Sequence, residues 1–561
     1  MSSSDATMMT AGAGESVDGG EAAGIPLLTG AVGGLAAALN QATTVAQEAT
    51  RLGAELTRIA WGLSDVAPAK GDRRFADPAW TVNPVFRMIG QSYLASAQAM
   101  DRIVAAMGDG RSDARAEQAR FAANIVTSAA APTNFLATNP AALKRAFDTG
   151  GMSLVRGARN FARDVRHNGA MPSMIEPDAF EVGRDLAVTP GAVVARDDVA
   201  EVLQYAPAAS TVLARPVLVV PPPIGRFYFL DLRPGRSFAE YATGRGLQTF
   251  MLTWRNPGPA QGHWDLDTYA QAVLGAIDTV REITGSPDVN LIGFCAGGII
   301  ATTVLNHLAA LNDHRVHSMS YAVTLLDFGL RAPITAFSGR RLIGFAGRRS
   351  RRKGIITSRQ MGSAFTWLRP DDLVFNYWVN NYLMGEPPPA FDILAWNADG
   401  TNLPGALHGQ FLDIFRDNLL ARRGGLRVLG TPLQLQDVTV PTFVTGALTD
   451  HLTPWKGCYR TTGLLGGPAT FVLSYSGHIA SLVNPPGNPK AHYWTGGPPG
   501  ADPEQWLARA EKHQGSWWEA WANWITARAG QRQPQPDSLG SERHPVLGPA
   551  PGLYVRDMAP G

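Results

Sequence analysis

The stretch LIGFCAGG, residues 291–298, sets the first expectation about the fold. Its apolar residues indicate a buried strand, and Gly293 and Gly297 flank Cys295 at the spacing of a nucleophile elbow, a strained turn between a strand and a helix. The turn needs small residues at these two positions, because larger side chains would clash there. A helix beginning near Ala296 would point its N-terminal amides at Cys295 and favour the thiolate. Cys295 is therefore the candidate nucleophile, although the pentapeptide alone fits a buried cysteine equally well.

Apolar runs of strand length surround this turn, and runs without polar alternation are typical of strands buried on both faces of a parallel sheet. Between the second and third runs, Val273, Ile277 and Val280 share one helical face behind a candidate N-cap at Asp267. Alternating strands and helices, together with the elbow, predict an α/β-hydrolase fold with a doubly wound, mostly parallel sheet. The runs lie at 215–220, 247–254, 289–294, 321–328, 441–447 and 469–475.

Changes in composition divide the chain into regions. The first residues are small, polar and Gly-rich and cannot bury enough apolar surface to become ordered. The next region is mainly helical, and at 83–107 Phe86, Ile89, Tyr93 and Leu94 recur at helical spacing. A long insertion without a βαβ repeat indicates a cap or lid. We expect a disordered tail at 1–25, a helical domain at 26–200, a catalytic domain at 201–530 with its cap at 329–432, and a Pro/Gly-rich C-terminal tail at 531–561.

The order of catalytic groups in this fold is nucleophile, acid, then histidine, with the last two in loops after later strands. Asp450 follows the apolar run at 441–447, and His478 follows the run at 469–475. His451 is the competing base, but it follows the acid directly and has no strand of its own. Cys458 lacks flanking elbow glycines, so we interpret it as a structural cysteine. The predicted triad is Cys295, Asp450 and His478.

The oxyanion hole of such a fold uses the amide after the nucleophile, here Ala296, and a second amide from a loop after an earlier strand. That loop is expected in VVPPPIGRFYFLD, where three prolines lack N–H groups. Ile224 is the first possible donor and our choice, and Gly225 is the next. The alternative is that the prolines only stiffen the exit from the strand.

Composition excludes several classes of function. The chain has 49 Lys+Arg and 47 Asp+Glu, a net charge of +2, so no global field favours nucleic acid or an anionic membrane. Two cysteines in 561 residues argue against a secreted disulfide scaffold and for a reducing, cytoplasmic location. Neither a signal peptide nor a transmembrane segment is visible. No metal site is expected.

The chain resembles the polyhydroxyalkanoate (PHA) synthases of the single-polypeptide class I/II type. The resemblance covers most of the chain and extends well beyond GFCAGG and TDHLTPW. One departure is Gly225, where many synthases have Asn. Matching segments include DRRFADPAWTVNPVFRMIGQSYL (72–94), VVPPPIGRFYFLDLRPGRS (219–237), NYWVNNYLMGEPPPAFDILAWNADGTNLPG (376–405) and SGHIASLVNPPGNPKA (476–491).

The resemblance implies polymerisation of (R)-3-hydroxyacyl-CoA into storage polyester, with Cys295 acylated, Asp450 as acid and His478 as base. CoA is then part of the substrate and a product, and no cofactor is implied. Trp396 matches a family tryptophan near the site, with packing in the cap as the alternative. The resemblance further implies a homodimer, association with polymer granules and contact with granule proteins.

Sulfur at the elbow suits this reaction, because transfer from CoA to Cys295 exchanges one thioester for another and keeps the acyl group activated. Two rival functions remain. A thiol-dependent hydrolase or intracellular polyester depolymerase could use the same triad, since the fold does not choose between water and an alcohol. A noncatalytic granule-coat protein would need only the helical region and would leave the triad without a purpose.

The densest positive run is SGRRLIGFAGRRSRRKG at 338–354, inside the expected cap. Arg348, Arg349, Arg351, Arg352 and Lys353 suit the phosphates of CoA by charge and geometry. A solvated, mobile loop is the alternative. Nucleic acid is a poorer candidate, because the rest of the chain has no basic excess and no recognisable reading module.

Overall fold

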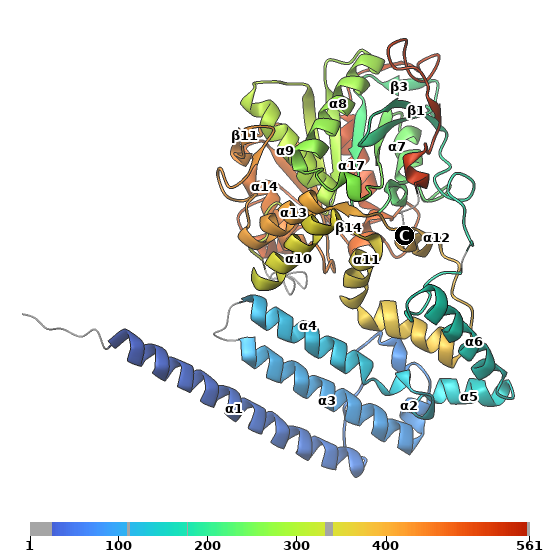
Figure 1. Ribbon diagram of the computed structural model, residues 1–561, viewed down its shortest axis with the longest axis vertical. Coiled ribbons are helices and arrows are strands. Elements are labelled where there is room, and N and C mark those ends of the chain that lie inside the picture. The colour runs from blue at the N-terminus through green and yellow to red at the C-terminus, as the bar shows by residue number, and fades with distance from the viewer. Residues whose placement is uncertain (1–24, 109–112, 177, 331–339, 558–561) are drawn as a thin grey trace, which may run out of the picture.

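The computed structural model describes residues 25–108, 113–176, 178–330 and 340–557 (Figure 1). Except for its last residue, the tail expected at 1–25 lies outside these residues, and so do positions 331–339 of the expected cap. The described part comprises a helical N-terminal region and an α/β domain built on one large sheet. Among the described helices, none is long and apolar enough to cross a membrane.

Helices make up the N-terminal region, as the sequence predicts. Helices α1, α3 and α4 lie side by side in Figure 1, and α5 and α6 continue toward the α/β domain. The predicted helix at 83–107 is α3, and the Asn83 side chain accepts the Val85 N–H at its start (3.0 Å). The bounds are α1 Ile25–Ala60, α2 Ala79–Val82, α3 Pro84–Gly108, α4 Asp113–Ala129, α5 Pro140–Asp148 and α6 Met152–His167.

The central sheet has eleven strands in the order β15-β14-β13-β12-β7-β6-β4-β5-β2-β1-β17. The strands from β13 through β5 are parallel, and antiparallel strands flank them on both sides. This is the predicted mostly parallel sheet. The bounds are β1 Gly191–Arg196, β2 Ala200–Tyr205, β4 Val217–Val220, β5 Thr249–Trp254, β6 Val289–Phe294, β7 Val316–Ala322, β12 Thr442–Ala447, β13 Ala469–Ser474, β14 His492–Thr495, β15 Glu511–Gln514 and β17 Gly548–Pro549.

Helices cover both faces of the sheet, which explains the continuous apolar runs. Val273 of α8 and Ile300 of α9 belong to one buried cluster, and Phe238 of α7 and Trp521 of α17 belong to another. Each cluster rests on one side of the parallel strands. The bounds are α7 Phe238–Gly244, α8 Leu266–Thr284, α9 Ala296–Ala310, α14 Trp455–Leu464, α15 His478–Leu482, α16 Pro503–Arg509 and α17 Trp517–Thr526.

The strand predicted at 321–328 is misplaced, because the strand is β7, Val316–Ala322. Its sequence, VHSMSYA, contains serines that hide it from a search for apolar runs. Both serines are buried and hydrogen-bonded: Ser318 donates to Asn290 Oδ1 (2.6 Å), and Ser320 accepts the indole N–H of Trp521 (3.1 Å). A buried strand therefore tolerates polar residues when neighbours satisfy them.

The N-cap predicted at Asp267 is also wrong, because α8 begins two residues earlier. Asp265 is the N-cap, and its carboxylate accepts the Thr268 N–H (3.0 Å). Asp267 lies in the first turn and accepts the Leu429 N–H (3.1 Å). The helix already includes Leu266, whose side chain is buried in the core. The side chain that caps the helix must therefore come from the residue before Leu266, which is Asp265.

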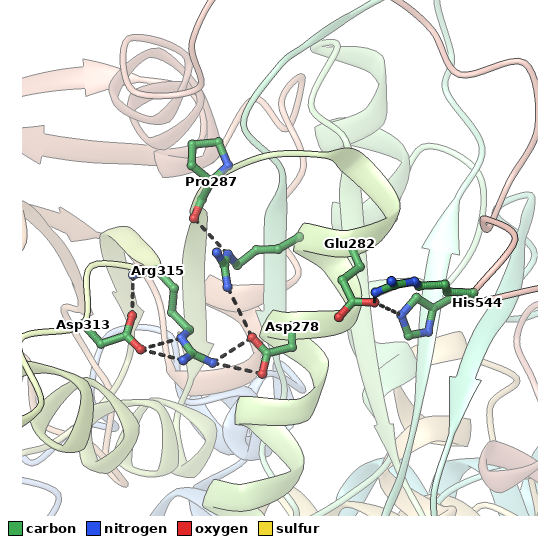
Figure 2. Close-up of polar contacts among 8 residues, drawn as sticks. Asp278, Glu282, Pro287, Asp313, Arg315 and His544 are labelled. Carbon is green, nitrogen blue, oxygen red and sulfur yellow. Dashed lines mark hydrogen bonds and ion pairs between the residues drawn. The ribbon is translucent and has the colours of Figure 1, made fainter.

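Both ends of the expected catalytic domain differ from the described structure. The sheet begins with β1 at Gly191, before the expected boundary at 200. Part of the expected tail at 531–561 joins the domain, because β16 (Arg532–Pro534) pairs with β3 (Thr211–Leu213) and β17 pairs with β1. Figure 2 shows His544 of this segment beside Glu282 of α8, with Nε2 3.2 Å from Oε2.

The cap insertion lies between β7 and β12, and in Figure 1 its yellow part sits between the helical region and the α/β domain. Helix α10 packs along α13. The basic run at 338–354 is therefore mainly helix and not a loop, as far as it is described. The bounds are α10 Arg340–Lys353, β8 Ile355–Ile356, α11 Ser358–Trp367, two π-helical turns at Asp371–Phe375 and Trp378–Leu383, α12 Asp392–Ala398, β9 Leu403–Pro404, α13 Gly405–Asp417, β10 Arg427–Val428 and β11 Thr431–Pro432.

Candidate active site

The predicted elbow forms between β6 and α9. Cys295 has φ 50° and ψ −122°, a strained conformation, and its N–H donates to Ala322 O (2.9 Å). A Cβ on Gly293 would lie 2.5 Å from the Cα of Gly298, and a Cβ on Gly297 would overlap Val220 O. The two glycines are therefore required by close backbone contacts. The half-buried Cys295 stands at the start of α9.

The predicted acid and base meet beside this cysteine. Asp450 lies after β12 and His478 is the first residue of α15, after β13. His478 Nδ1 is 2.6 Å from Asp450 Oδ2, and Cys295 lies close enough to the His478 ring to raise its pKa. The described structure thus brings the three predicted side chains into one place, with the imidazole between the sulfur and the carboxylate.

Asp450 accepts hydrogen bonds on both oxygens. The amides of Leu452 and Thr453 donate to Oδ1 (2.8 and 2.9 Å). The Thr453 hydroxyl and His478 Nδ1–H donate to Oδ2 (2.7 and 2.6 Å). These donors fix the plane of the carboxylate and therefore the orientation of the imidazole. The sequence carried one signal for Thr453, a hydroxyl residue three positions after an aspartate, which is typical of turns built on an Asp side chain.

Burial and charge shift the pKa values of the pair in opposite directions. Burial alone would lower the pKa of His478, but the Asp450 carboxylate and, to a smaller extent, Cys295 outweigh it and raise this pKa from 6.5 to about 10. Burial would raise the pKa of Asp450, but His478 and Thr453 hold it below its usual value of 3.8. The site therefore stabilises an imidazolium, the state that forms when His478 takes a proton.

The competing residues take other positions. The ring of His451 is half-buried, and burial and then Arg369 lower its pKa. No hydrogen bond joins His451 to Asp450 or Cys295 in the part of the chain that is described. Cys458 is fully buried in α14, its thiol donates to Thr453 O (3.5 Å), and burial raises its pKa. Cys458 thus packs behind the acid and is not exposed at the elbow.

The loop after β4 lies against the elbow, because a Cβ on Gly297 would also approach Pro221 O (2.6 Å). The Gly225 N–H donates to Thr401 Oγ1 (2.9 Å) and is therefore engaged. Within the described chain, the N–H groups of Ile224 and Ala296 donate to no protein acceptor. Of the two loop donors considered from the sequence, Ile224 is the one left open to a ligand.

Trp396 of α12 packs on this loop. Its ring would lie 3.0 Å from a Cβ on Gly225, and its indole N–H donates to Arg226 O (2.6 Å). The ring also contacts Phe229, with centroids 5.2 Å apart. Gly225 has φ 82°, so glycine suits both the backbone and the space beneath the indole. Trp396 thus supports the loop from the cap.

Arg348, Arg349, Arg351 and Arg352 lie on α10, with no described contact to the triad. The Arg351 guanidinium reaches α13, where a Cβ on Gly409 would overlap it. Burial and then the nearby Arg351 lower the pKa of His408 on α13 to about 4. All four arginines are exposed, and among the described contacts Arg351 is the one of the four that reaches a second cap helix.

Comparisons with known proteins show the family to which the chain is similar. Residues 71–242 match the family described as Poly-beta-hydroxybutyrate polymerase (PhaC) N-terminus, and residues 233–485 match the alpha/beta hydrolase fold. Poly(3-hydroxyalkanoate) polymerase 1 of Ectopseudomonas oleovorans is 44% identical over 95% of this chain and 94% of its own length. The polymerase subunit PhaC of Cupriavidus necator is 38% identical over 89% of this chain and 86% of its own length. The chain therefore belongs to the poly(3-hydroxyalkanoate) polymerase family.

Proposed function

We propose that the protein polymerises (R)-3-hydroxyacyl-CoA into polyhydroxyalkanoate through an acyl group carried on Cys295, with release of CoA. The observation that carries this proposal is the His478–Asp450 pair beside Cys295, at the elbow of a chain from the polymerase family. Cysteine at this position keeps the acyl group activated as a thioester.

In the first step His478 takes the proton of Cys295, and the thiolate attacks the carbonyl carbon of the substrate thioester. The N–H groups of Ala296 and Ile224 hold the developing oxyanion. The bond to CoA sulfur then breaks, and the CoA thiolate takes the proton from His478. The acyl group is now bound to Cys295.

In the second step His478 takes the proton of a 3-hydroxyl group, from another hydroxyacyl unit or from the growing chain. The alkoxide attacks the acyl carbon on Cys295, the C–S bond breaks, an oxoester forms, and the released Cys295 thiolate takes the proton back from His478. Asp450 orients and charge-balances His478, a role that its four hydrogen bonds support. A direct role for Asp450 at the hydroxyl is less favoured, since its oxygens are already engaged.

The setting of the enzyme is part of the proposal. The cap excludes water, which would hydrolyse the acyl-enzyme. The protein acts as a homodimer in the cytoplasm, at the surface of polymer granules and in contact with granule proteins. It needs no cofactor, and no nucleic acid takes part.

The test is to incubate purified protein with 3-hydroxybutyryl-CoA and with longer 3-hydroxyacyl-CoAs, and to measure CoA release and polymer together. A synthase gives CoA and polymer in matching amounts. CoA release with free hydroxy acid and no polymer would instead identify a thiol-dependent hydrolase. Absence of CoA release with every substrate would leave the noncatalytic granule-coat function.

A further inference from the structure

Thr401 of the cap lies against both residues that flank Ile224. Its hydroxyl oxygen accepts the Gly225 N–H (2.9 Å), and its hydroxyl proton goes to Pro223 O (3.1 Å). The side chain is buried, with a residue exposure of 6%. One hydroxyl from the cap therefore makes both of its hydrogen bonds to the loop after β4.

The bond to Pro223 O has a consequence for Ile224. The Pro223 carbonyl and the Ile224 N–H belong to the same peptide group, which is planar. The peptide is trans, because Ala550–Pro551 is the one cis peptide among the described residues. In a trans peptide the N–H points away from the C=O, so fixing the Pro223 carbonyl also fixes the direction of the Ile224 N–H.

The residues that precede and follow Thr401 in the chain are bonded to the α/β domain. Asp399 accepts hydrogen bonds from Arg226 Nε (2.8 Å) and from the Tyr228 hydroxyl (2.9 Å). On the other side, the Asn402 N–H donates to Asn256 Oδ1 (2.9 Å). These contacts join the cap to the α/β domain, so the Thr401 hydroxyl has a defined position.

We propose that Thr401 is a positioning residue for the oxyanion hole: from the cap, it orients the Pro223–Ile224 peptide so that the Ile224 N–H faces the acyl oxygen. The inference rests on the proposed function, which assigns Ile224 as the second donor. It means that the oxyanion hole is complete only when the segment between α12 and β9 is seated on the loop. A shift of the cap would reduce acylation even with Cys295, His478 and Asp450 intact.

The test compares two substitutions of one side chain. Thr401→Val keeps the shape and removes the hydroxyl, whereas Thr401→Ser keeps the hydroxyl and removes the methyl group. Single-turnover release of CoA measures acylation of Cys295, and steady-state assays give kcat and KM. Thr366→Val is the matched control, because Thr366 is also a buried cap residue but bonds within its own helix, to Gly362 O (2.8 Å). Thermal unfolding of each variant measures its stability.

We expect Thr401→Val to slow acylation by about 10-fold to 100-fold. This loss should not exceed the loss caused by removing one oxyanion donor, because the Ile224 N–H remains present but is less well oriented. The KM should change little, because the interaction forms in the transition state. Thr401→Ser and Thr366→Val should stay close to the wild type. Acylation at the wild-type rate in Thr401→Val, or equal losses in the Val and Ser variants, would overturn the inference.

This outcome is separable from a failure of the proposed function. The wild-type product, polymer or free hydroxy acid, decides between synthase and hydrolase. The ratio of CoA release between Thr401→Val and Thr401→Ser decides the role of Thr401, because both reactions begin with the same acylation. A drop in melting temperature shared by both variants, with equal loss of activity, would mark a purely structural role and contradict the inference.

Discussion

The main electrostatic interaction of the site is the contact between the Asp450 carboxylate and the His478 imidazole. Both residues are buried, with exposures of 7% and 6%, and burial disfavours each charge separately. At 2.6 Å the two charges stabilise each other enough to outweigh that cost. Such a pair contributes to stability as well as to catalysis, and its contribution depends on pH.

We expect Asp450→Asn to lower stability most at mildly acidic pH. The folded pKa of His478, about 10, lies above its ordinary 6.5, so its contribution is complete below pH 6.5 and is lost as pH rises toward 10. The folded pKa of Asp450 is below 3.8, so its contribution is present above pH 3.8 and lost at lower pH. The variant lacks both contributions. The difference in melting temperature from wild type should therefore be larger at pH 6 than at pH 9, and an equal difference at both values would refute the ion pair.

The two cysteines should respond differently to replacement. Cys295→Ala should abolish CoA release without lowering the melting temperature, because Cys295 is half-buried and serves as the nucleophile. Cys458→Ala should keep most activity and lose some stability, because it leaves a cavity where a fully buried side chain stood. CoA release and thermal unfolding of both variants check this. Equal loss of CoA release from the two would show that the assignment of the nucleophile is wrong.

At the scale of elements, the sequence predicted what depends on local backbone chemistry. The elbow follows from the two glycines that its close backbone contacts require. The strand β7 could not be predicted, because the polarity of its serines is satisfied by Asn290 and by Trp521, distant in sequence. The role of Thr401 was equally hidden, since its partners are about 176 residues away. Local patterns reveal elements, whereas pairing between elements requires the structure.

The exposed arginines of α10 provide a prediction at this scale. Replacing Arg348, Arg349 and Arg352 with Gln should raise KM for hydroxyacyl-CoA and weaken the salt dependence of kcat/KM, because the phosphates lose cationic partners. Arg351 is left intact, since it packs against Gly409. A truncated thioester without the nucleotide should show hardly any change.

The control removes the same charge elsewhere in the cap, at the exposed residues Arg359, Arg422 and Arg423. This triple Gln variant should keep the wild-type KM. An unchanged KM at low salt in the α10 variant, or an equal rise in both triple variants, would mean that α10 is only a solvated surface.

Across the whole molecule, three regions that are far apart in sequence hold the cap, two of them directly and the C-terminal segment through Arg226. The side chain of Arg226, after the oxyanion loop, bonds Asp399 of the cap and the carbonyls of Tyr554 and Asp557 (2.8, 3.2 and 2.6 Å). The buried Glu201 accepts the Tyr554 N–H (3.0 Å). The C-terminal segment expected as a tail thus supports the active site. Its Pro/Gly-rich composition gave no sign of this, because backbone carbonyls make these contacts whatever the side chains are.

The third region is the helical N-terminal domain, which contacts the cap through α6. Gly157 lies directly against the backbone of Tyr382, and a Cβ there would overlap the Tyr382 carbonyl oxygen. Beside it, Asn160 Nδ2 donates to Asn381 O (3.0 Å) and the Tyr382 hydroxyl donates to Asp164 (2.8 Å). The same cap continues into α12 and Thr401. Displacing α6 should therefore act on the oxyanion hole through the cap.

We expect Gly157→Ala to lower stability by about 1–3 kcal/mol, because the added methyl group forces α6 away from the cap backbone. Acylation of Cys295 should slow in the same variant, since the cap positions Thr401 and Trp396 on the oxyanion loop. Gly53→Ala is the control in the same domain: nothing lies within 4 Å of its Cβ, and Ala favours helix α1. It should keep full activity with equal or higher stability. Thermal unfolding and single-turnover CoA release measure both effects, and normal acylation in a destabilised Gly157→Ala would show that the helical domain supports the fold without influencing the active site.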